Sequence, residues 1–238
     1  MDVRERILQA ATDLLVASPD ADVSTRAVCE AAGVGAPMLY RLFGDKAGLL
    51  AAVVDHGFED YLAAKRATRP SDDPVQDLRD GWTNHVQYAL ENPNQYRLMY
   101  SPGLTVPPGA AAEAFGLLRA TVERCAAAGR LRVAPATATQ VIMSANTGVA
   151  LSLIARPAFY PDPAFSDLVR DAVIDAVTRP ADAPVHDAPE SPVPSVATTL
   201  GALLRAEPSG ALSSAETALL QQWLDALAER RGHPPEKS

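Results

Sequence analysis

The sequence predicts an all-α protein. Apolar residues recur every three or four positions along most of the chain, which is the spacing of helices with one buried face. Prolines and glycines gather between these periodic stretches, as they do at helix ends and in loops. The chain has 238 residues, of which 47% are hydrophobic and 21% charged, so it can bury a core. We therefore expect an N-terminal three-helix domain, a larger helical domain and an extra C-terminal helical appendage.

The first predicted helix begins at Val3 and ends near Ser18-Pro19. Asp2 and Glu5 have the spacing of a capping box, in which the side chain of each residue accepts a hydrogen bond from the backbone N–H of the other. Apolar residues at helical spacing then form one stripe. A short acidic loop leads to Ser24, whose hydroxyl is suited to capping the next helix.

Two short helices and a tight turn follow. The first ends at Gly33, where the missing Cβ permits the positive φ of a helix-terminating turn. Pro37 has a fixed φ and no N–H, so it suits the first turn of the second helix, whose inward face carries Leu39 and Phe43. Two short helices joined by such a turn form a helix-turn-helix, a motif that places its second helix in the DNA major groove.

A long helix is predicted over 46–66, with Asp45 as its cap. It is followed by the breaker-rich segment 67–74, ATRPSDDP, which marks a domain boundary. Residues 1–66 are therefore expected to form the first domain, and the helix 46–66 connects it to the rest of the chain.

The larger domain is expected over 67–179 and to be entirely helical. Two of its helices, 135–155 and about 165–176, carry many small residues, which allow a neighbouring helix to approach closely. This pair is suited to a two-fold helix bundle between subunits. The other helices are expected at 75–91, from Pro93 to Tyr100, and after a loop at 101–109, where the helix that carries Phe115 stops at Gly129.

A Pro-rich linker is predicted over 180–195, because its prolines and acidic residues should not pack. The appendage 196–231 then contains two helices, 196–206 and 212–231, the second with a capping box at Ser213 and Glu216. It carries no recognisable motif, and we expect it to pack on its own chain or on a partner subunit.

The N-terminal segment resembles the DNA-binding domain of the TetR family of bacterial transcriptional regulators. The resemblance covers about residues 3–62 and rests on these matches, in register: Ser24-x-Arg26, Ala31-Ala32-Gly33-Val34, Leu39-Tyr40, Phe43 and Lys46-x-Gly48-Leu49-Leu50. It implies a homodimer that binds a palindromic operator in double-stranded DNA, usually as a repressor, and is released by a small-molecule effector. Beyond this segment the likeness is one of layout.

Six residues carry side chains suited to DNA contacts. The tyrosine that matches Tyr40 contacts phosphate in the resembled family, and Lys46 stands at a helix start, where free N–H groups already attract anions. Arg26 and Arg41 are long enough to reach a base edge, and arginine suits guanine. Ser24 and Thr25 are candidates for phosphate contacts. Each has a structural alternative: a surface charge, a solvated aromatic or a helix cap.

The start of the second short helix departs from the family pattern. Many relatives carry small polar residues or lysine there, whereas this chain has Gly35, Ala36, Pro37 and Met38. These residues offer backbone amides and apolar contact with a thymine methyl, but little hydrogen-bond readout. The operator sequence is therefore not predictable from this helix.

The resemblance also implies an effector pocket in the larger domain. Aromatic and polar residues there could line an apolar cavity with a few anchors, although core packing is the alternative for each of them. His85 and Asn146 are the best polar candidates, because a buried polar side chain needs a partner. The full candidate set is Trp82, His85, Tyr88, Tyr96, Met99, Tyr100, Phe115, Met143, Asn146 and Phe159.

The charge of the chain argues against a generally basic nucleic-acid binder. The net charge is −8, and residues 1–66 carry seven Lys or Arg against ten Asp or Glu. Between Ser24 and Lys46 the balance turns positive, with three basic and two acidic residues. The excess of acidic residues and the lack of hydrogen-bonding side chains at 35–38 leave an alternative open: a helical ligand-binding or protein-interaction module that has lost specific DNA binding.

An enzyme is the other rival, and no motif favours it. The four histidines lack metal-ligand spacing, and the chain has no G-x-S-x-G, P-loop or dinucleotide fingerprint. We expect no cofactor and no metal. Cys29 and Cys125 are expected to be buried free thiols. No apolar run of 18 residues and no signal peptide is evident, so we expect a cytoplasmic protein without a membrane partner.

Overall fold

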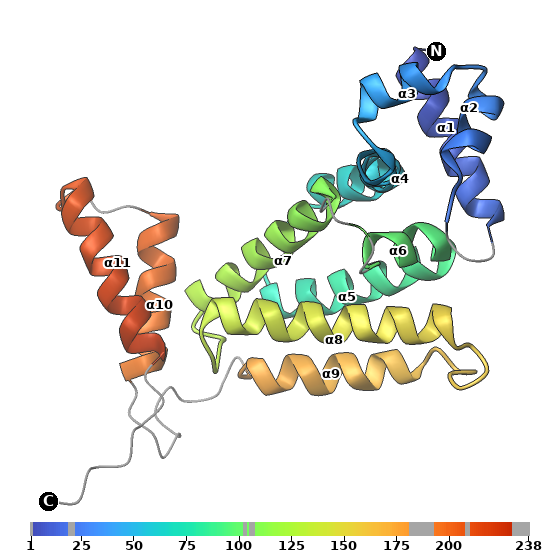
Figure 1. The fold of residues 1–238 in the computed structure, drawn as a ribbon. Coiled ribbons are helices and arrows are strands. Elements are labelled where there is room, and N and C mark those ends of the chain that lie inside the picture. The colour runs from blue at the N-terminus through green and yellow to red at the C-terminus, as the bar shows by residue number, and fades with distance from the viewer. Residues whose placement is uncertain are drawn as a thin grey trace, which may run out of the picture. The chain divides into compact units, whose positions relative to one another are not determined.

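The structure is a computed structural model that describes residues 2–18, 22–101, 104, 108–180, 193–207 and 210–229. Within these ranges the chain forms eleven α-helices and no extended strand (Figure 1). One isolated antiparallel bridge joins Leu131 and Thr178. The all-α prediction is confirmed.

The first four helices contain the predicted helix-turn-helix. α1 packs against α2 and α4, and α3 packs against both α2 and α4. Their buried faces share one apolar core, which includes Ile7, Val28, Leu39 and Val53. The bounds are α1 Val3–Ala17, α2 Thr25–Ala32, α3 Ala36–Phe43 and α4 Lys46–Ala67.

Two of the three predicted caps at these helices are confirmed. Asp2 and Glu5 form the capping box of α1. Asp45 caps α4 by accepting a hydrogen bond of 2.8 Å from the Gly48 N–H. Ser24 occupies the N-cap position of α2, but its exposed side chain makes no capping hydrogen bond, so that prediction was wrong. Water can solvate this hydroxyl in place of the helix N–H groups.

The later helices match their predicted positions closely. α10 begins three residues earlier than predicted because Pro194 lies in its first turn, where a missing N–H breaks no hydrogen bond. Most of the predicted linker 180–195, and residues 230–231 of the predicted last helix, lie outside the described residues. The bounds are α5 Pro74–Glu91, α6 Pro93–Met99, α7 Gly109–Ala127, α8 Pro135–Ala155, α9 Phe165–Val177, α10 Val193–Ala206 and α11 Ser214–Glu229.

The chain folds into two compact units, each built from separate stretches of sequence. The first unit comprises 1–69, 84–117 and 148–163, and the second comprises 70–83, 118–147 and 164–238. The divisions fall inside α5, α7 and α8. Each of these three helices therefore contributes a segment to both units.

In the first unit, α6 is bonded to the end of α1. The Asn94 amide nitrogen lies 3.0, 3.2 and 2.9 Å from the carbonyl oxygens of Leu15, Val16 and Ser18, so its two N–H groups serve three acceptors, with one N–H shared. The last carbonyls of a helix have no partner within the helix. Asn94 therefore satisfies acceptors that α1 cannot satisfy itself.

In the second unit, polar contacts join helices far apart in sequence. The Trp82 indole N–H donates to Ser166 Oγ at 3.0 Å, and Arg79 lies 2.9 Å from Asp175. Arg205 of α10 pairs with Glu123 of α7 at 3.2 Å. Cys125 is a buried free thiol, and burial raises its pKa to about 12.

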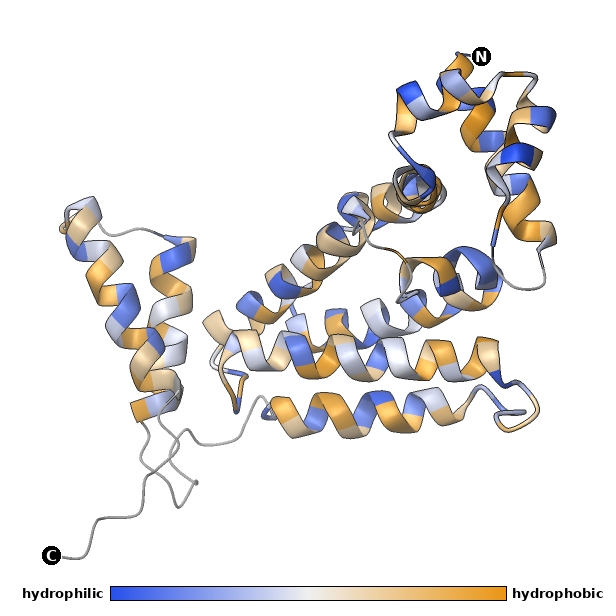
Figure 2. Cartoon of the chain, viewed as in Figure 1, coloured by the Kyte–Doolittle hydropathy of each residue, from blue (hydrophilic) through white to orange (hydrophobic). Residues whose placement is uncertain are grey.

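α8 is a long helix in which apolar residues are interrupted by polar ones, as its orange, white and blue colouring in Figure 2 shows. Its length and composition would allow it to cross a membrane, yet 44% of its 18-residue apolar window is buried inside the protein. It also buries the polar residues Thr139 and Asn146. These features are typical of a core helix.

Candidate nucleic-acid interface

The turn between α2 and α3 has the geometry that the sequence predicts. Gly33 adopts φ 63°, in the left-handed region that favours glycine. The Val34 N–H then donates to the Cys29 carbonyl at 3.0 Å, which closes the end of α2. Leu39 is fully buried and fixes α3 against the core. The opposite side of α3 is consequently left at the surface.

A second tight turn sets the start of α4 relative to α3. Gly44 adopts φ 80°, and the Gly48 Cα lies so close to the preceding turn that a Cβ would be 2.1 Å from the Phe43 carbonyl oxygen. Glycine is therefore required at position 48 for steric reasons. This close approach brings Lys46, at the first position of α4, next to the end of α3.

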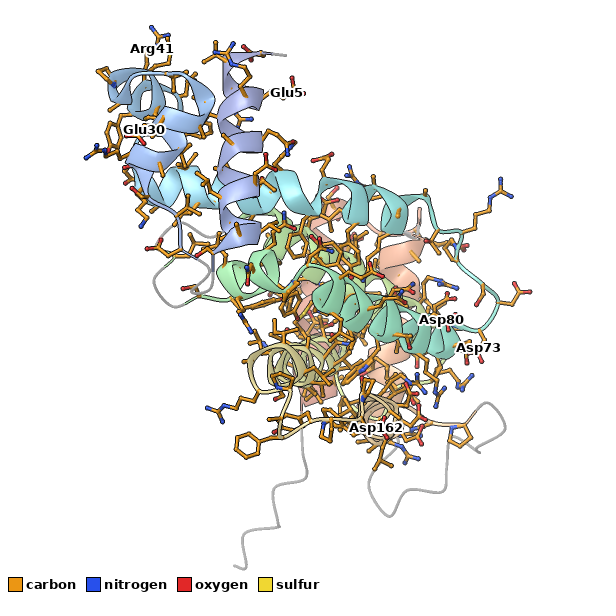
Figure 3. All side chains as sticks on the ribbon, turned by 90° about the vertical axis from the view of Figure 1, so that its right-hand side faces the viewer. Glu5, Glu30, Arg41, Asp73, Asp80 and Asp162 are labelled. Atoms are coloured by element: carbon orange, nitrogen blue, oxygen red, sulfur yellow. The ribbon has the colours of Figure 1, made fainter. Side chains whose placement is uncertain are left out.

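The candidate DNA-contacting residues lie mostly at the surface. Tyr40 is 46% exposed and the Arg26 side chain is 89% exposed. Arg41 extends away from the ribbon (Figure 3). Ser24, Gly35, Ala36, Pro37 and Lys46 are also exposed, and Thr25 and Met38 are partly buried.

Two of the candidate cations are paired with carboxylates of the same domain. Lys46 Nζ lies 2.7 Å from Asp22 Oδ1, and Arg26 Nε lies 3.0 Å from Glu30 Oε1. The Lys46 ammonium donates a hydrogen bond to Asp22 and lowers the pKa of that carboxyl below its usual value. Both pairs are solvent-exposed and therefore weak.

Arg41 has a different partner. Its guanidinium donates to the Met38 sulfur, one turn earlier on α3, at 3.0 Å. A thioether is a weak acceptor, so this contact orients the arginine without neutralising it. Arg41 forms no ion pair with any described residue.

Sequence reasoning missed one cation beside this surface. The Arg4 guanidinium of α1 lies over the Phe43 ring, 5.4 Å from its centroid. Such a contact holds the charge near the end of α3. The two residues are 39 positions apart, and no pattern in the sequence signals this contact.

The candidate effector residues divide between the two units. In the first unit, the rings of Tyr88, Tyr96, Tyr100 and His85 form a chain of aromatic contacts with Phe58 and Tyr61 of α4. Met99 is buried in the same core. Phe115 is partly exposed and Phe159 is 78% exposed. In the second unit, Trp82 and Asn146 are buried and Met143 is partly buried.

His85 is the polar centre of the aromatic group. Its Nε2 lies 2.6 Å from the Tyr96 hydroxyl, and its Nδ1 lies 3.3 Å from the Tyr61 hydroxyl. Burial, with a smaller effect from Lys65, lowers the His85 pKa to about 3, so the ring is neutral near pH 7. One phenol donates to the ring and the ring donates to the other, which satisfies both nitrogens.

Lys65 adds a cation at the edge of this group. Its Nζ lies 4.9 Å from the centre of the Tyr61 ring, and burial lowers the Lys65 pKa to about 8. Lys65 forms no ion pair within the described part of the chain. Phe58 and Tyr61 follow the helical period of α4, so the sequence alone gave them only a connecting role, and it did not single out Lys65.

Asn146 has one unsatisfied group. Its amide nitrogen donates to the Trp82 carbonyl at 3.2 Å, whereas its Oδ1 is buried without a partner among the described residues. A buried acceptor of this kind is uncommon and costs free energy. It is the clearest polar feature among the candidates of the second unit.

Two protein-family models match the chain. Residues 7–53 match the bacterial regulatory proteins of the tetR family, and residues 78–188 match the tetracyclin repressor-like C-terminal domain. No curated protein matches the sequence.

Solved structures of the same fold agree with these matches. A TetR-family regulator from a Shewanella species has a TM-score of 0.58 at 20% identity, covering 76% of this chain and 100% of its own. A TetR variant from Acinetobacter baumannii, in complex with minocycline, has a TM-score of 0.57 at 20% identity, covering 74% and 96%. NalD of Pseudomonas aeruginosa, a repressor of a multidrug efflux pump, has a TM-score of 0.52 at 19% identity, covering 74% and 97%.

The two family matches extend over both the N-terminal helices and the larger helical region. Together with the helix-turn-helix geometry, they agree with the resemblance seen in the sequence. The chain belongs to the TetR family of bacterial transcriptional regulators.

Proposed function

We propose that this protein is a ligand-responsive repressor that binds a palindromic operator as a homodimer. Residues 1–66 read the DNA, and 67–179 carry the effector site and the dimer contacts. The observation that carries the proposal is the exposure of Arg26, Tyr40 and Arg41 on two helices whose other faces are buried. Such a surface offers long polar side chains to a duplex and keeps its shape through the core beneath it.

The side chains have separate roles in this proposal. Arg41 and Arg26 read base edges, since a guanidinium can donate two hydrogen bonds to guanine. Tyr40 and Lys46 contact phosphates and set the register of α3. The exposed Gly35, with its neighbours Ala36 and Pro37, lets the backbone approach the groove closely.

A dimer is needed because one α3 covers only half a site. The two α3 helices must lie about 34–36 Å apart, or a multiple of this, to enter successive major grooves. We propose that α8 and α9 form the dimer contacts, as a helix pair rich in small residues can. Leu168 of α9 is 75% exposed, and such an apolar side chain is suited to burial by a partner.

The effector site is proposed at the aromatic group around His85. α4 carries Lys46 at its start and Tyr61 and Lys65 near its end, so one helix connects both sites. At 1.5 Å per residue the distance along α4 from Lys46 to Tyr61 is roughly 22 Å. An effector that binds more tightly to a form of the dimer with a different spacing of the α3 helices shifts the population towards that form and away from DNA. The size of this shift is limited by the difference in the effector's affinity for the two forms.

The test is selection of bound DNA from a random pool, followed by anisotropy titration of the selected duplex. Arg41→Ala should weaken specific binding by roughly 1–3 kcal/mol and relax base preference at one position of each half-site. Arg69→Ala is the matched control, because Arg69 is an exposed arginine in the loop after α4. Unchanged affinity and preference in Arg41→Ala would exclude Arg41 as a reader.

The alternative function, a helical module without specific DNA binding, is favoured by the two ion pairs that engage Arg26 and Lys46 and by the net negative charge of residues 1–66. Salt dependence separates the two. A regulator should show log affinity falling steeply against log salt and a selected consensus. A chain that yields no consensus and no saturable binding at low salt has the alternative function.

A further inference from the structure

The second unit contains a pocket with an unusual concentration of arginine. Its volume is about 380 Å³, within the range of small-molecule sites. The lining includes four arginines against one carboxylate, in a chain whose net charge is −8. The lining residues are Val75, Arg79, Arg130, Arg132, Asp175, Thr178, Arg179 and Pro180.

Backbone pairing builds this pocket. The loop after α7 meets the end of α9 through the Leu131–Thr178 bridge, and the Arg179 N–H donates to the Arg130 carbonyl at 2.8 Å. Arg130 Nε donates to the Arg179 carbonyl at 2.7 Å, and Arg132 Nε donates to the Thr178 carbonyl at 2.6 Å. Both guanidiniums are therefore fixed through Nε, and among the described residues the only carboxylate near their terminal nitrogens is Asp73, 3.8 Å from Arg130 Nη1.

The four arginines differ in how far they are neutralised. Arg79 pairs with Asp175 at 2.9 Å and with Asp171 at 3.4 Å. Arg130 has only Asp73, at 3.8 Å. Neither Arg132 nor Arg179 forms an ion pair within the part of the chain that the structure describes.

Arg179 also carries an unsatisfied donor. Its Nε is buried and has no hydrogen-bond partner among the described residues. Leaving a buried donor of a charged group unpaired is costly, and like charges in one pocket repel each other. An oxyanion in the pocket would relieve the repulsion between the arginines, because guanidinium forks match carboxylate and phosphate oxygens.

We propose that this pocket binds a small molecule bearing phosphate or carboxylate groups, with at least two negative charges. Arg132 and Arg179 contribute the free charges, and Arg130 contributes a weakly paired one. Arg79 stays with its two aspartates and forms one wall. The site is separate from the residues proposed to bind DNA, so it stands or falls independently of that function.

The test uses the full chain and two probes, sodium pyrophosphate and sodium citrate. Each is titrated calorimetrically at an ionic strength held constant with sodium chloride. We expect saturable binding of at least one probe at millimolar concentration or below. Binding of pyrophosphate alone identifies a phosphate ligand, and binding of citrate alone identifies a carboxylate ligand. If neither probe gives a saturable heat of binding, the proposal is overturned. This outcome is obtained with the unaltered protein, so it does not depend on whether a variant folds.

Variants then locate the site. Arg132→Gln and Arg179→Gln should each weaken binding about tenfold or more, tenfold being near the lower end of the range for a hydrogen bond to a charged group. Arg179→Lys keeps the charge but removes the planar guanidinium fork, so it should restore only part of the affinity. Arg69→Gln, at an exposed arginine of the other unit, should bind as the unaltered protein does. Equal affinity in all four variants, each verified as folded by circular dichroism, would place the ligand elsewhere.

Discussion

Replacing Asp22 with Asn should strengthen DNA binding if Lys46 contacts a phosphate. Lys46 Nζ lies 2.7 Å from Asp22 Oδ1 and must leave this carboxylate to reach DNA. Exposed ion pairs contribute about 0.2–1 kcal/mol, so this is the free energy lost in each protomer on binding. Asp22→Asn removes that loss, which corresponds to ~1.4- to 5-fold per protomer and about 2- to 30-fold for a symmetric dimer.

The assay is an anisotropy titration of the selected operator with Asp22→Asn, Asp13→Asn and the unaltered protein. Asp13 is an exposed carboxylate of α1 that accepts a hydrogen bond from Gln9 and forms no ion pair among the described residues. It therefore controls for the loss of one negative charge. Because Lys46 lowers the pKa of Asp22, that carboxylate is ionised throughout a titration near pH 7.

Two results would refute the reasoning. If Asp22→Asn and Asp13→Asn raise affinity equally, the effect is one of net charge and does not involve Lys46. If Asp22→Asn weakens binding while its unfolding free energy falls by no more than about 1 kcal/mol, the pair positions Lys46 instead of competing with DNA.

The other predictions concern stability. Gly48→Ala should lower the unfolding free energy by roughly 1–3 kcal/mol in urea titration, since its Cβ would meet the Phe43 carbonyl oxygen at 2.1 Å. Gly116→Ala is the control, because no atom lies within 4 Å of the position of its Cβ on α7, and it should cause no such loss. Equal losses in the two variants would contradict the steric argument. The pKa of His85 is about 3 in the folded protein, against an ordinary value of 6.5. Below pH 6.5 the unfolded chain therefore takes up a proton that the folded protein does not. The contribution of His85 to the unfolding free energy is complete above pH 6.5 and is lost on acidification towards pH 3, by up to about 1.4 kcal/mol per pH unit. His85→Phe should show a shallower fall in unfolding free energy between pH 7 and pH 5, as measured in urea; a slope equal to that of the unaltered protein would show that His85 is not buried in its neutral form.

Local signals were sufficient for the architecture. Asp2 with Glu5, Gly33 and Asp45 each determine a helix end through atoms within a few residues, and the structure confirms all three. Ser24 failed as a cap because a hydroxyl exposed to water has an alternative to the helix N–H. Pro194 was misjudged because proline both terminates helices and fits their first turn.

The site was less predictable because its partners are distant in sequence. The Lys46–Asp22 pair spans 24 positions, and the Arg4 contact with Phe43 spans 39. Periodicity also cannot decide which side of a mostly apolar helix is buried. Outside the helices there is no periodicity to use: Phe159 was a candidate for lining the pocket on residue type alone, yet it lies in the turn after α8 and is exposed. Tyr61 belongs with His85 through a hydrogen bond that no spacing rule contains.

The contacts of the Asn94 amide mean that, if α1 and α6 separate, the carbonyls at the end of α1 either lose their hydrogen-bond donor or must be hydrated by water that enters between the helices. The first domain is therefore joined to the following helices not only through α4 but also through this contact at the end of α1. A fragment cut after residue 66 would lose this contact and should fray at the end of α1. In the intact chain, a ligand that displaces α6 would tilt α1 directly, even if α4 stayed rigid.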